Sequence, residues 1–163
     1  MTNKISQTKT KQPNSQHCFV CGVGNSCGLQ LEFYESSPGE VTVNTTIPDR
    51  YQGYPGVVHG GIVAALVDEA LGRVHMGNDP ENPRFMYTAK LSIRYRKPVP
   101  INAPIKIIAH AVKKKRLSAT SVAKIYGSSD EILVDAEAVL VNVPEETIQS
   151  VDMETLGWKV YPD

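Results

Sequence analysis

The spacing of apolar residues along the chain predicts one long helix and a set of strands. From about Gly60 to about Met76, apolar residues recur with helical period, and they fill one side of that helix: Ile62, Val63, Leu66, Val67, Ala70, Leu71 and Val74. Elsewhere polar and apolar residues alternate, as in half-buried strands. Two such segments precede the helix, LQLEFYE and EVTVNTTI, and four follow it: FMYTAKLSIRYRKPV, PIKIIAHAVKKKR, LSATSVAKIYGS and EILVDAEAVLVNV.

This order, β-β-α-β-β-β-β, predicts an α+β fold. A single helix next to one sheet favours an antiparallel sheet of about six strands wrapped around one long central helix. The junctions between the later strands are short, and short junctions favour antiparallel pairing of successive strands as a meander.

The length of 163 residues fits one domain with a sizeable core. Residues 1–16 are polar and are predicted to be a disordered tail. The domain is expected over residues 17–143. Residues 144–163 form a C-terminal extension, either a short helix that packs back or a loose tail.

The charge balance excludes several classes of partner. Lys plus Arg and Asp plus Glu number 17 each, so no general binding to nucleic acid or to an anionic membrane is expected. No apolar run approaches the roughly 20 residues of a membrane span. Residues 1–16 have no apolar segment typical of a secretory signal, so a cytoplasmic location is expected.

The opposite side of the predicted helix is unusual, because small residues surround an acid there. Ala64, Ala65 and Gly72 lie near Asp68, and small residues let another backbone come close. We infer that this side meets another surface, with a second subunit as the candidate. At the helix start, Gly60 and Gly61 offer free N–H groups that can hold an anion or an oxyanion.

Asp68 is the candidate nucleophile or general base. Gly60 lies eight residues earlier, which is roughly 12 Å along a helix that rises about 1.5 Å per residue. One reacting carbonyl cannot touch both groups on one chain. The sequence therefore predicts a homodimer with two antiparallel copies of the helix and the active site across the interface.

The pattern HGG followed by an acid nine residues after the His, in this order of elements, resembles the hotdog-fold acyl-CoA thioesterases. The stretches CFVCGVGNSCGLQL and YQGYPGVVHGGIVAALVDEALG are similar to the phenylacetate-pathway-type (PaaI-like) thioesterase family. The resemblance covers roughly residues 17–143. It implies a hotdog fold, hydrolysis of an acyl-CoA to free acid and coenzyme A, and no cofactor. It also implies homodimers that often pair into homotetramers.

The resemblance also implies roles for single residues. The N–H of Gly60 polarises the thioester carbonyl, and Asp68 of the other subunit attacks it or activates water. An Asn or Gln usually stands six residues before the His; here Gly53 has that place, so Gln52 fills the role only if the loop shifts by one residue. Thr88 matches a Ser or Thr that orients water in members close to the human enzymes.

Other residues near the helix start allow more than one interpretation. His59 is a candidate general base, but a local hydrogen bond that shapes the helix start is the favoured interpretation. Glu69 points about 100° away from Asp68, so it is the second choice for the base and a candidate substrate contact, together with Gly61. His75 and His110 are interpreted as structural.

Two pairs of basic residues are candidates for the phosphates of coenzyme A. Lys115 and Arg116 belong to a basic run at a hairpin tip, which is equally well interpreted as a solvated turn. Arg94 and Arg96 share one face of their strand.

The three cysteines lie close together in the sequence, as Cys18, Cys21 and Cys27, with His17 adjacent. Four zinc ligands within eleven residues are cramped compared with a usual structural zinc site. Free or buried thiols are therefore favoured, and no metal site is predicted.

Three rival functions remain open at this stage. One is another hotdog reaction on an acyl thioester, such as hydration or dehydration. The second is a non-catalytic module that binds or senses acyl-CoA. The weakest is a zinc-stabilised interaction module.

Overall fold

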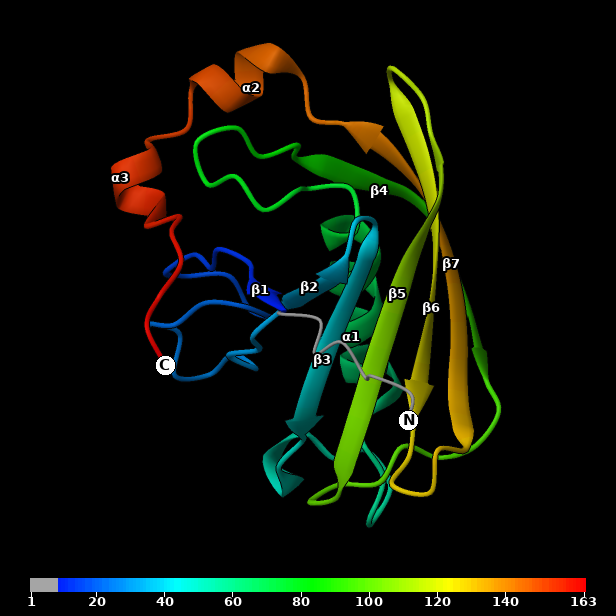
Figure 1. Cartoon of the computed structure of the whole chain (residues 1–163). Coiled ribbons are helices and arrows are strands. Elements are labelled where there is room, and N and C mark those ends of the chain that lie inside the picture. Colours follow the sequence, from blue (N-terminus) through cyan, green and yellow to red (C-terminus); the bar gives the residue numbers. More distant parts are fainter. Residues whose placement is uncertain (1–8) are drawn as a thin grey trace, which may run out of the picture.

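A computed structural model describes residues 9–163 of the chain (Figure 1). Its elements follow the predicted order, with one extra short strand at the beginning and two short helices at the end. The strands are β1 (Thr10–Lys11), β2 (Tyr34–Ser37), β3 (Glu40–Thr46), β4 (Met86–Tyr95), β5 (Pro104–Lys114), β6 (Ser118–Tyr126) and β7 (Ile132–Asn142). The helices are α1 (Gly60–Arg73), α2 (Glu145–Gln149) and α3 (Met153–Leu156), with a 3-10 turn at Asp49–Tyr51.

The strands form one antiparallel sheet in the order β1-β2-β3-β5-β6-β7-β4. Helix α1 lies behind β3 and β5 in Figure 1 and packs against the sheet. The α+β prediction with a sheet around one central helix is therefore confirmed, with seven strands in place of about six.

The predicted meander is correct for β5, β6 and β7 but wrong for β4. Strand β4 pairs with β7 at the sheet end, while β5 pairs with β3. The connection after β4 crosses the start of α1, where the Val58 N–H donates to the Val99 carbonyl at 2.8 Å and the Asn102 N–H donates to the Ile47 carbonyl at 2.8 Å. This crossing carries the chain from one side of the helix to the other.

The core lies between α1 and the sheet. Within α1, Val63, Leu66, Val67, Ala70 and Leu71 are buried, which confirms most of the predicted apolar side. The helix ends at Arg73, three residues before the predicted end, because residues 74–76 continue as a turn. Among residues 9–163, none of the helices has the length and apolar character to cross a membrane.

The first predicted strand, residues 29–35, is mostly irregular. Only Tyr34–Ser37 pairs in the sheet. Leu31 and Phe33 are buried as expected. The Leu29 and Leu31 N–H groups, however, donate to the Phe19 and Val20 carbonyls, each at 2.8 Å. These carbonyls belong to residues 17–28, the cysteine loop, which carries the three cysteines. The alternating pattern identified the buried residues, and the loop supplied the backbone partners in place of a strand.

The predicted disordered tail, residues 1–16, lies partly outside the described residues. Residues 9–16 are ordered, unlike that expectation: Gln12, Asn14 and Ser15 are buried. The Asn14 N–H donates to the Lys159 carbonyl at 2.9 Å, and the Lys159 N–H donates back to the Asn14 carbonyl at 3.1 Å. Backbone hydrogen bonds therefore join the two ends of the described chain, and composition alone does not predict such pairing between distant segments.

Candidate functional site

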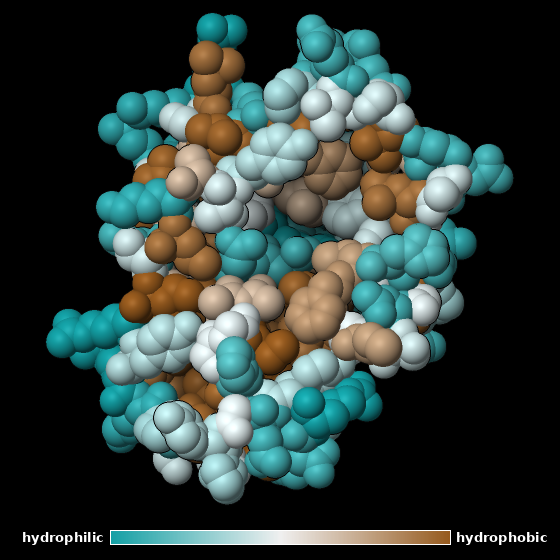
Figure 2. Space-filling model, turned by 180° about the vertical axis from the view of Figure 1, so that it is seen from behind, coloured by the Kyte–Doolittle hydropathy of each residue, from teal (hydrophilic) through white to brown (hydrophobic). Residues whose placement is uncertain are grey.

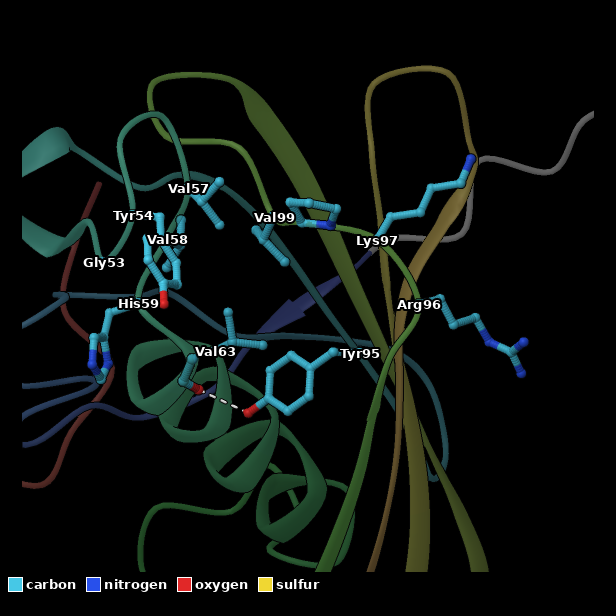
Figure 3. A pocket seen from close by; sticks show the side chains of 12 residues that line it. Gly53, Tyr54, Val57, Val58, His59, Val63, Tyr95, Arg96, Lys97 and Val99 are labelled. Atoms are coloured by element: carbon cyan, nitrogen blue, oxygen red, sulfur yellow. Dashed lines mark hydrogen bonds between the residues drawn. The ribbon is translucent and has the colours of Figure 1, made fainter.

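A cavity of about 790 Å³ opens at the first turn of α1 (Figure 3). Its apolar wall comes from four valines, Val57, Val58, Val63 and Val99. Strand β4 and the connection after it add Tyr95, Arg96 and Lys97. In Figure 3 the Arg96 and Lys97 side chains extend away from the valines, so the cavity has an apolar interior and a cationic rim.

The loop before α1 is shaped by its own backbone. The Gly53 N–H donates to the Val57 carbonyl at 2.9 Å, and Gly56 has a φ of 81°, where glycine is favoured. Gln52 Oε1 accepts from the Gly56 N–H at 3.2 Å. Gln52 is not among the residues that line the cavity. The Gln52 side chain thus closes the loop and lies outside the lining of the cavity at Gly60, and its role at the thioester carbonyl stays a prediction.

His59 is the N-cap of α1. Its Nδ1 atom accepts a hydrogen bond from the Gly61 N–H at 3.0 Å, which occupies the donor that we expected Gly61 to offer to substrate. This geometry agrees with the interpretation of His59 as a residue that shapes the helix start. The Gly60 N–H has no hydrogen-bond acceptor within residues 9–163 and borders the cavity. One free donor therefore remains at the positive end of the helix dipole.

Tyr95 holds the first turn of α1 against β4. Its hydroxyl donates to the Gly60 carbonyl at 2.8 Å (Figure 3). A Cβ atom added to Gly60 would meet Tyr95 at 3.8 Å, an ordinary contact. The free space at Gly60 is therefore sufficient for a small side chain.

Asp68 and Thr88 come together, as the two residues proposed for one reaction centre require. Thr88 Oγ1 donates to Asp68 Oδ1 at 2.7 Å, with Asp68 half-buried and Thr88 exposed. The pairing of β4 with β7 is irregular between Thr88 and Lys90. Asp68 does not line the cavity at Gly60. On one chain, the acid and the free N–H group lie apart, as the helix rise predicts.

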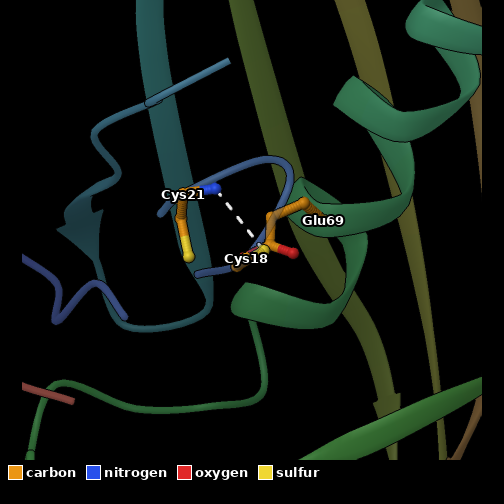
Figure 4. Close-up of side chains that lie close together, drawn as sticks. All are labelled: Cys18, Cys21 and Glu69. Carbon is orange, nitrogen blue, oxygen red and sulfur yellow. Dashed lines mark hydrogen bonds between the residues drawn. The ribbon is translucent and has the colours of Figure 1, made fainter. Parts of the chain in front are cut away.

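Glu69 points to a different part of the protein. Its Oε1 atom accepts from Arg73 Nε at 2.9 Å, and the Arg73 side chain is only 1% exposed. The Cys18 and Cys21 sulfurs and a Glu69 carboxylate oxygen all lie within 4.8 Å of one another (Figure 4). Glu69 is therefore far better placed to meet the cysteine loop than to contact a substrate in the cavity.

The two clustered thiols have opposite acidities. Hydrogen bonding with the Cys21 side chain lowers the pKa of the Cys18 thiol to about 6, whereas the same bond and burial raise the pKa of the Cys21 thiol. Cys27 and His17 are exposed, and neither belongs to the cluster. The structure thus brings Cys18 and Cys21 together and leaves His17 and Cys27 outside the cluster.

The predicted basic residues do not share one place. Arg96 lines the cavity and donates to Asp135 Oδ2. Arg94 lies in a hollow of about 420 Å³ with Lys124 and with Asp135, the residue that Arg96 also binds, so the two arginines lie near one carboxylate. Lys115 and Arg116 form the β5–β6 turn, at the end of the sheet opposite to the loop before α1 (Figure 1).

Sequence reasoning missed three residues of this region. Tyr95 continues the inward-facing alternation of Leu91 and Ile93, so the strand pattern contained a signal for it. Nothing in the pattern marked Lys97. The charge of Arg73 gives no sign of burial in the sequence, but Arg73 is buried, because Phe33 and the Pro13 carbonyl cover it.

His75 and His110, the two histidines interpreted as structural, lie away from the cavity at Gly60. His75 is buried with its Nε2 atom 3.1 Å from the Thr120 carbonyl, and burial lowers its pKa. His110 is exposed on β5 with its Nδ1 atom 3.4 Å from Glu40 Oε2. Neither lines the cavity at Gly60.

Comparison with known proteins gives this arrangement a family context. The sequence model of the thioesterase superfamily matches residues 55–133. The bovine (Bos taurus) acyl-coenzyme A thioesterase THEM4 is 31% identical over 84 residues, which are 51% of this chain and 32% of that protein. The chain therefore spans about a third of the length of this relative.

Solved structures show the same fold. The thioesterase superfamily protein RHA08564 is 28% identical with a TM-score of 0.69, over 77% of this chain and 60% of that one. Protein smu.793 from Streptococcus mutans UA159, solved bound to acetyl CoA, is 20% identical with a TM-score of 0.62, over 69% and 88%. Zebra fish thioesterase superfamily member 2 is 20% identical with a TM-score of 0.62, over 74% and 90%. The chain thus has the hotdog fold of the thioesterase superfamily, and residues 55–133 match that superfamily's sequence pattern.

Proposed function

We propose that this protein hydrolyses acyl-CoA thioesters to a free acid and coenzyme A. The observation that carries the proposal is the unbonded Gly60 N–H at the apolar cavity, at the start of a helix. The similarity to the bovine acyl-coenzyme A thioesterase and to a structure solved with acetyl CoA supports this substrate class.

In this proposal the thioester carbonyl accepts a hydrogen bond from the Gly60 N–H. Attack on the carbonyl carbon places negative charge on its oxygen, and a fixed donor at a helix N-terminus stabilises that charge without reorganising. The valines next to Gly60 suit the apolar part of the substrate near the thioester. Arg96 and Lys97 are the cations at the rim that suit the phosphates of coenzyme A.

The second reacting group comes from another copy of the chain. Strand β4 ends the sheet, and within residues 9–163 it has no strand on its outer side. A free edge of 10 residues is a surface for antiparallel pairing with an identical strand. Asp68 and Thr88 lie at this edge. On the face opposite to that of Figure 1, a hollow has both hydrophobic and hydrophilic residues at its rim (Figure 2).

Such a homodimer would bring Asp68 of one copy to Gly60 of the other. If Asp68 acts as base, it takes the proton from an attacking water and passes it to the departing sulfur of coenzyme A, which leaves the free acid. If Asp68 attacks the carbonyl carbon itself, coenzyme A leaves as a thiolate that takes a proton from solvent, and water then hydrolyses the acyl–Asp68 anhydride to the free acid. Thr88 holds one oxygen of Asp68 and so orients the carboxylate. Pairing of dimers into a homotetramer and the cytoplasmic location stay predictions.

The role of the Gly60 N–H can be tested by a matched pair of variants. Gly60→Pro removes this donor without a conflict in the local backbone, because proline suits the first helical position and His59, with φ −58° and ψ 136°, has the extended conformation required before proline. Gly60→Ala keeps the donor. We expect release of coenzyme A from a panel of short, long and aromatic acyl-CoAs to fall about 10²- to 10³-fold in Gly60→Pro only.

Equal activity of the two Gly60 variants would contradict the oxyanion role. Saturable binding without release by the wild type would overturn hydrolysis and support a binding module. A blank with each acyl-CoA and free thiol corrects for reaction of the three cysteines.

The shared site can be tested by mixing inactive copies. A mixed dimer of Gly60→Pro and Asp68→Asn chains has one site in which both groups are intact. If the copies exchange at random, activity returns to about a quarter of the wild-type value. No recovery in mixtures that do exchange, as followed by native mass spectrometry, would place both groups of a site on one chain.

A further inference from the structure

We propose that Cys18, Cys21 and Glu69 bind one zinc ion. The two sulfurs and a carboxylate oxygen lie within 4.8 Å of one another, although Glu69 is 48 residues beyond Cys21 in the sequence. A tetrahedral zinc ion bonds sulfur at about 2.3 Å and carboxylate oxygen at about 2.0–2.2 Å, so its ligand atoms must lie this close together. This site is separate from the cavity at Gly60 and does not depend on the proposed hydrolysis.

The cysteine loop is folded in a way that favours a bound thiolate. The Val20 N–H donates to Cys18 Sγ at 3.3 Å, and the Cys21 N–H donates to the same sulfur at 3.5 Å (Figure 4). Two backbone donors aimed at one sulfur stabilise negative charge on it and fix its direction. Cys21 is buried, and its sulfur lies 3.6 Å from Ser15 Oγ. Both sulfurs are therefore held in place before a metal binds.

Glu69 is held by an outer partner, as metal-bound carboxylates usually are. Arg73 Nε donates to Oε1 at 2.9 Å, whereas Oε2 makes no hydrogen bond to the described residues. Arg73 is itself fixed by the Pro13 carbonyl at 2.6 Å and by the rings of Phe33 and Trp158. The charge of a zinc ion and that of Arg73 together balance two thiolates and one carboxylate, so a bound zinc leaves the half-buried cluster neutral.

The fourth zinc position faces a small cavity. A cavity of about 230 Å³ is lined by Cys18, Cys21 and Glu69 together with Phe85 and Trp158. Among residues 9–163, no fourth His, Cys, Asp or Glu joins the cluster. The buried Trp158 Nε1 donor has no partner in the described part of the chain. A zinc-bound water or small anion in this cavity would accept that hydrogen bond.

The expected role of this zinc ion is to fasten the cysteine loop to the middle of α1. Glu69 belongs to the helical turn that also carries Asp68, and the other two ligands belong to the loop between β1 and β2. A metal bond between them would restrain the direction of that turn and the packing of Trp158, and so of the C-terminal extension, on the same cluster.

The test is zinc binding by the full chain, kept reduced and first freed of metal with a chelator. Elemental analysis after titration should give one zinc per chain in the wild type. Cys27→Ser is the matched control, because its thiol lies in the same loop but is exposed and outside the cluster. We expect Cys27→Ser to keep the zinc, and Cys18→Ser and Cys21→Ser to lose it. Equal zinc content in Cys18→Ser and Cys27→Ser, or none in the wild type, would overturn the proposal.

A second measurement covers the case in which a cysteine variant fails to fold. Cobalt(II) added to the wild-type chain should give a near-ultraviolet absorption band of cobalt–thiolate charge transfer. Glu69→Gln keeps both thiols but removes the carboxylate ligand. Loss of an outer partner of a metal ligand lowers metal affinity at least about 10-fold, and we expect the zinc affinity of Glu69→Gln to fall by more than that. No thiolate band in the wild type, or unchanged zinc affinity in Glu69→Gln, would refute the three-ligand site.

Discussion

Asp68 and Glu69 are adjacent in the sequence but belong to two different regions of the molecule. Asp68 lies at the free edge strand β4, where the exposed Thr88 hydroxyl donates to it at 2.7 Å. Glu69 points into the protein and pairs with Arg73, a side chain that is 1% exposed. The two carboxylates are alike as chemical groups, so the difference comes from the roughly 100° between successive helix positions.

This difference suits Asp68 to a chemical role and Glu69 to a structural role. A half-buried acid at an open edge remains accessible to a second subunit and its substrate. An acid held by a buried cation contributes to the fold, and the same hold makes it a fixed metal ligand. The following variants test whether the two regions are as distinct in function as they are in structure.

The largest effect is expected from removal of the charge at Asp68. Asp68→Asn should lower kcat for release of coenzyme A by about 10²- to 10⁴-fold, the usual contribution of a positioned acid–base group. Glu69→Gln should lower it by less than about 10-fold, because Glu69 does not line the cavity and acts only through the packing of α1. Similar losses in both variants, measured in the same assay, would erase the distinction between the two acids.

The next effect is a loss of stability at the partner of Glu69. Arg73→Ala removes the ion pair, the bond to the Pro13 carbonyl and the stacking on Phe33, and it leaves the Glu69 charge unpaired. We expect the free energy of unfolding in urea to fall by about 3–5 kcal/mol. Arg94→Ala, a change on an exposed position, should stay within about 0.5 kcal/mol. A decrease in the free energy of unfolding of less than about 1 kcal/mol in Arg73→Ala would mean that the Glu69–Arg73 region does not stabilise the fold.

A smaller effect is expected from Thr88. Thr88→Val removes the hydroxyl that holds Asp68, and a hydrogen bond to a charged group is worth about 1.5–3 kcal/mol, so kcat should fall about 10- to 100-fold with little change in KM. Thr88→Ser restores the hydroxyl and should recover most of the activity. A variant that raises KM and leaves kcat unchanged would instead make Thr88 a substrate-binding residue.

The smallest effect is expected in the pH dependence of the free energy of unfolding, to which buried His75 contributes and which is distinct from the roles of the two acids. Burial lowers the pKa of His75 in the folded chain, so the unfolded chain binds its proton at a higher pH. Its contribution to stability is complete above the ordinary histidine pKa of about 6.5 and is lost as the pH falls below it, with a slope of at most about 1.4 kcal/mol per pH unit. His75→Gln should flatten the unfolding free energy between pH 7 and pH 5. An unchanged slope would assign the acid sensitivity to other groups.

The sequence predicted the candidate site best where the pattern is local. The helix start at Gly60, the side of α1 that is buried and the inward alternation of β4 all follow from periods of 3.6 and 2. His59 as a residue of the helix start also follows from its position next to the helix. Such features depend on residues a few positions apart, whose geometry is fixed by the backbone.

Non-local contacts were not predictable in the same way. Lys97 comes to the cavity because the connection after β4 crosses the start of α1, and the order of residues 9–16 depends on bonds to the other end of the chain. Strand β4 pairs with β7 and not with β5, the next strand along the chain. Each of these contacts joins segments whose separation in sequence carries no information about their separation in space.

The α+β order of elements, the amphipathic helix and the two acids in its middle turn can be read from the amino-acid sequence alone. Which acid faces the open edge and which meets Arg73, Cys18 and Cys21 depends on how the chain packs. The physical reason is that hydrophobic periodicity specifies which side of an element is buried, whereas hydrogen bonds, ion pairs and metal ligands need atoms within a few ångströms. That proximity arises only when the packed core has brought distant segments together.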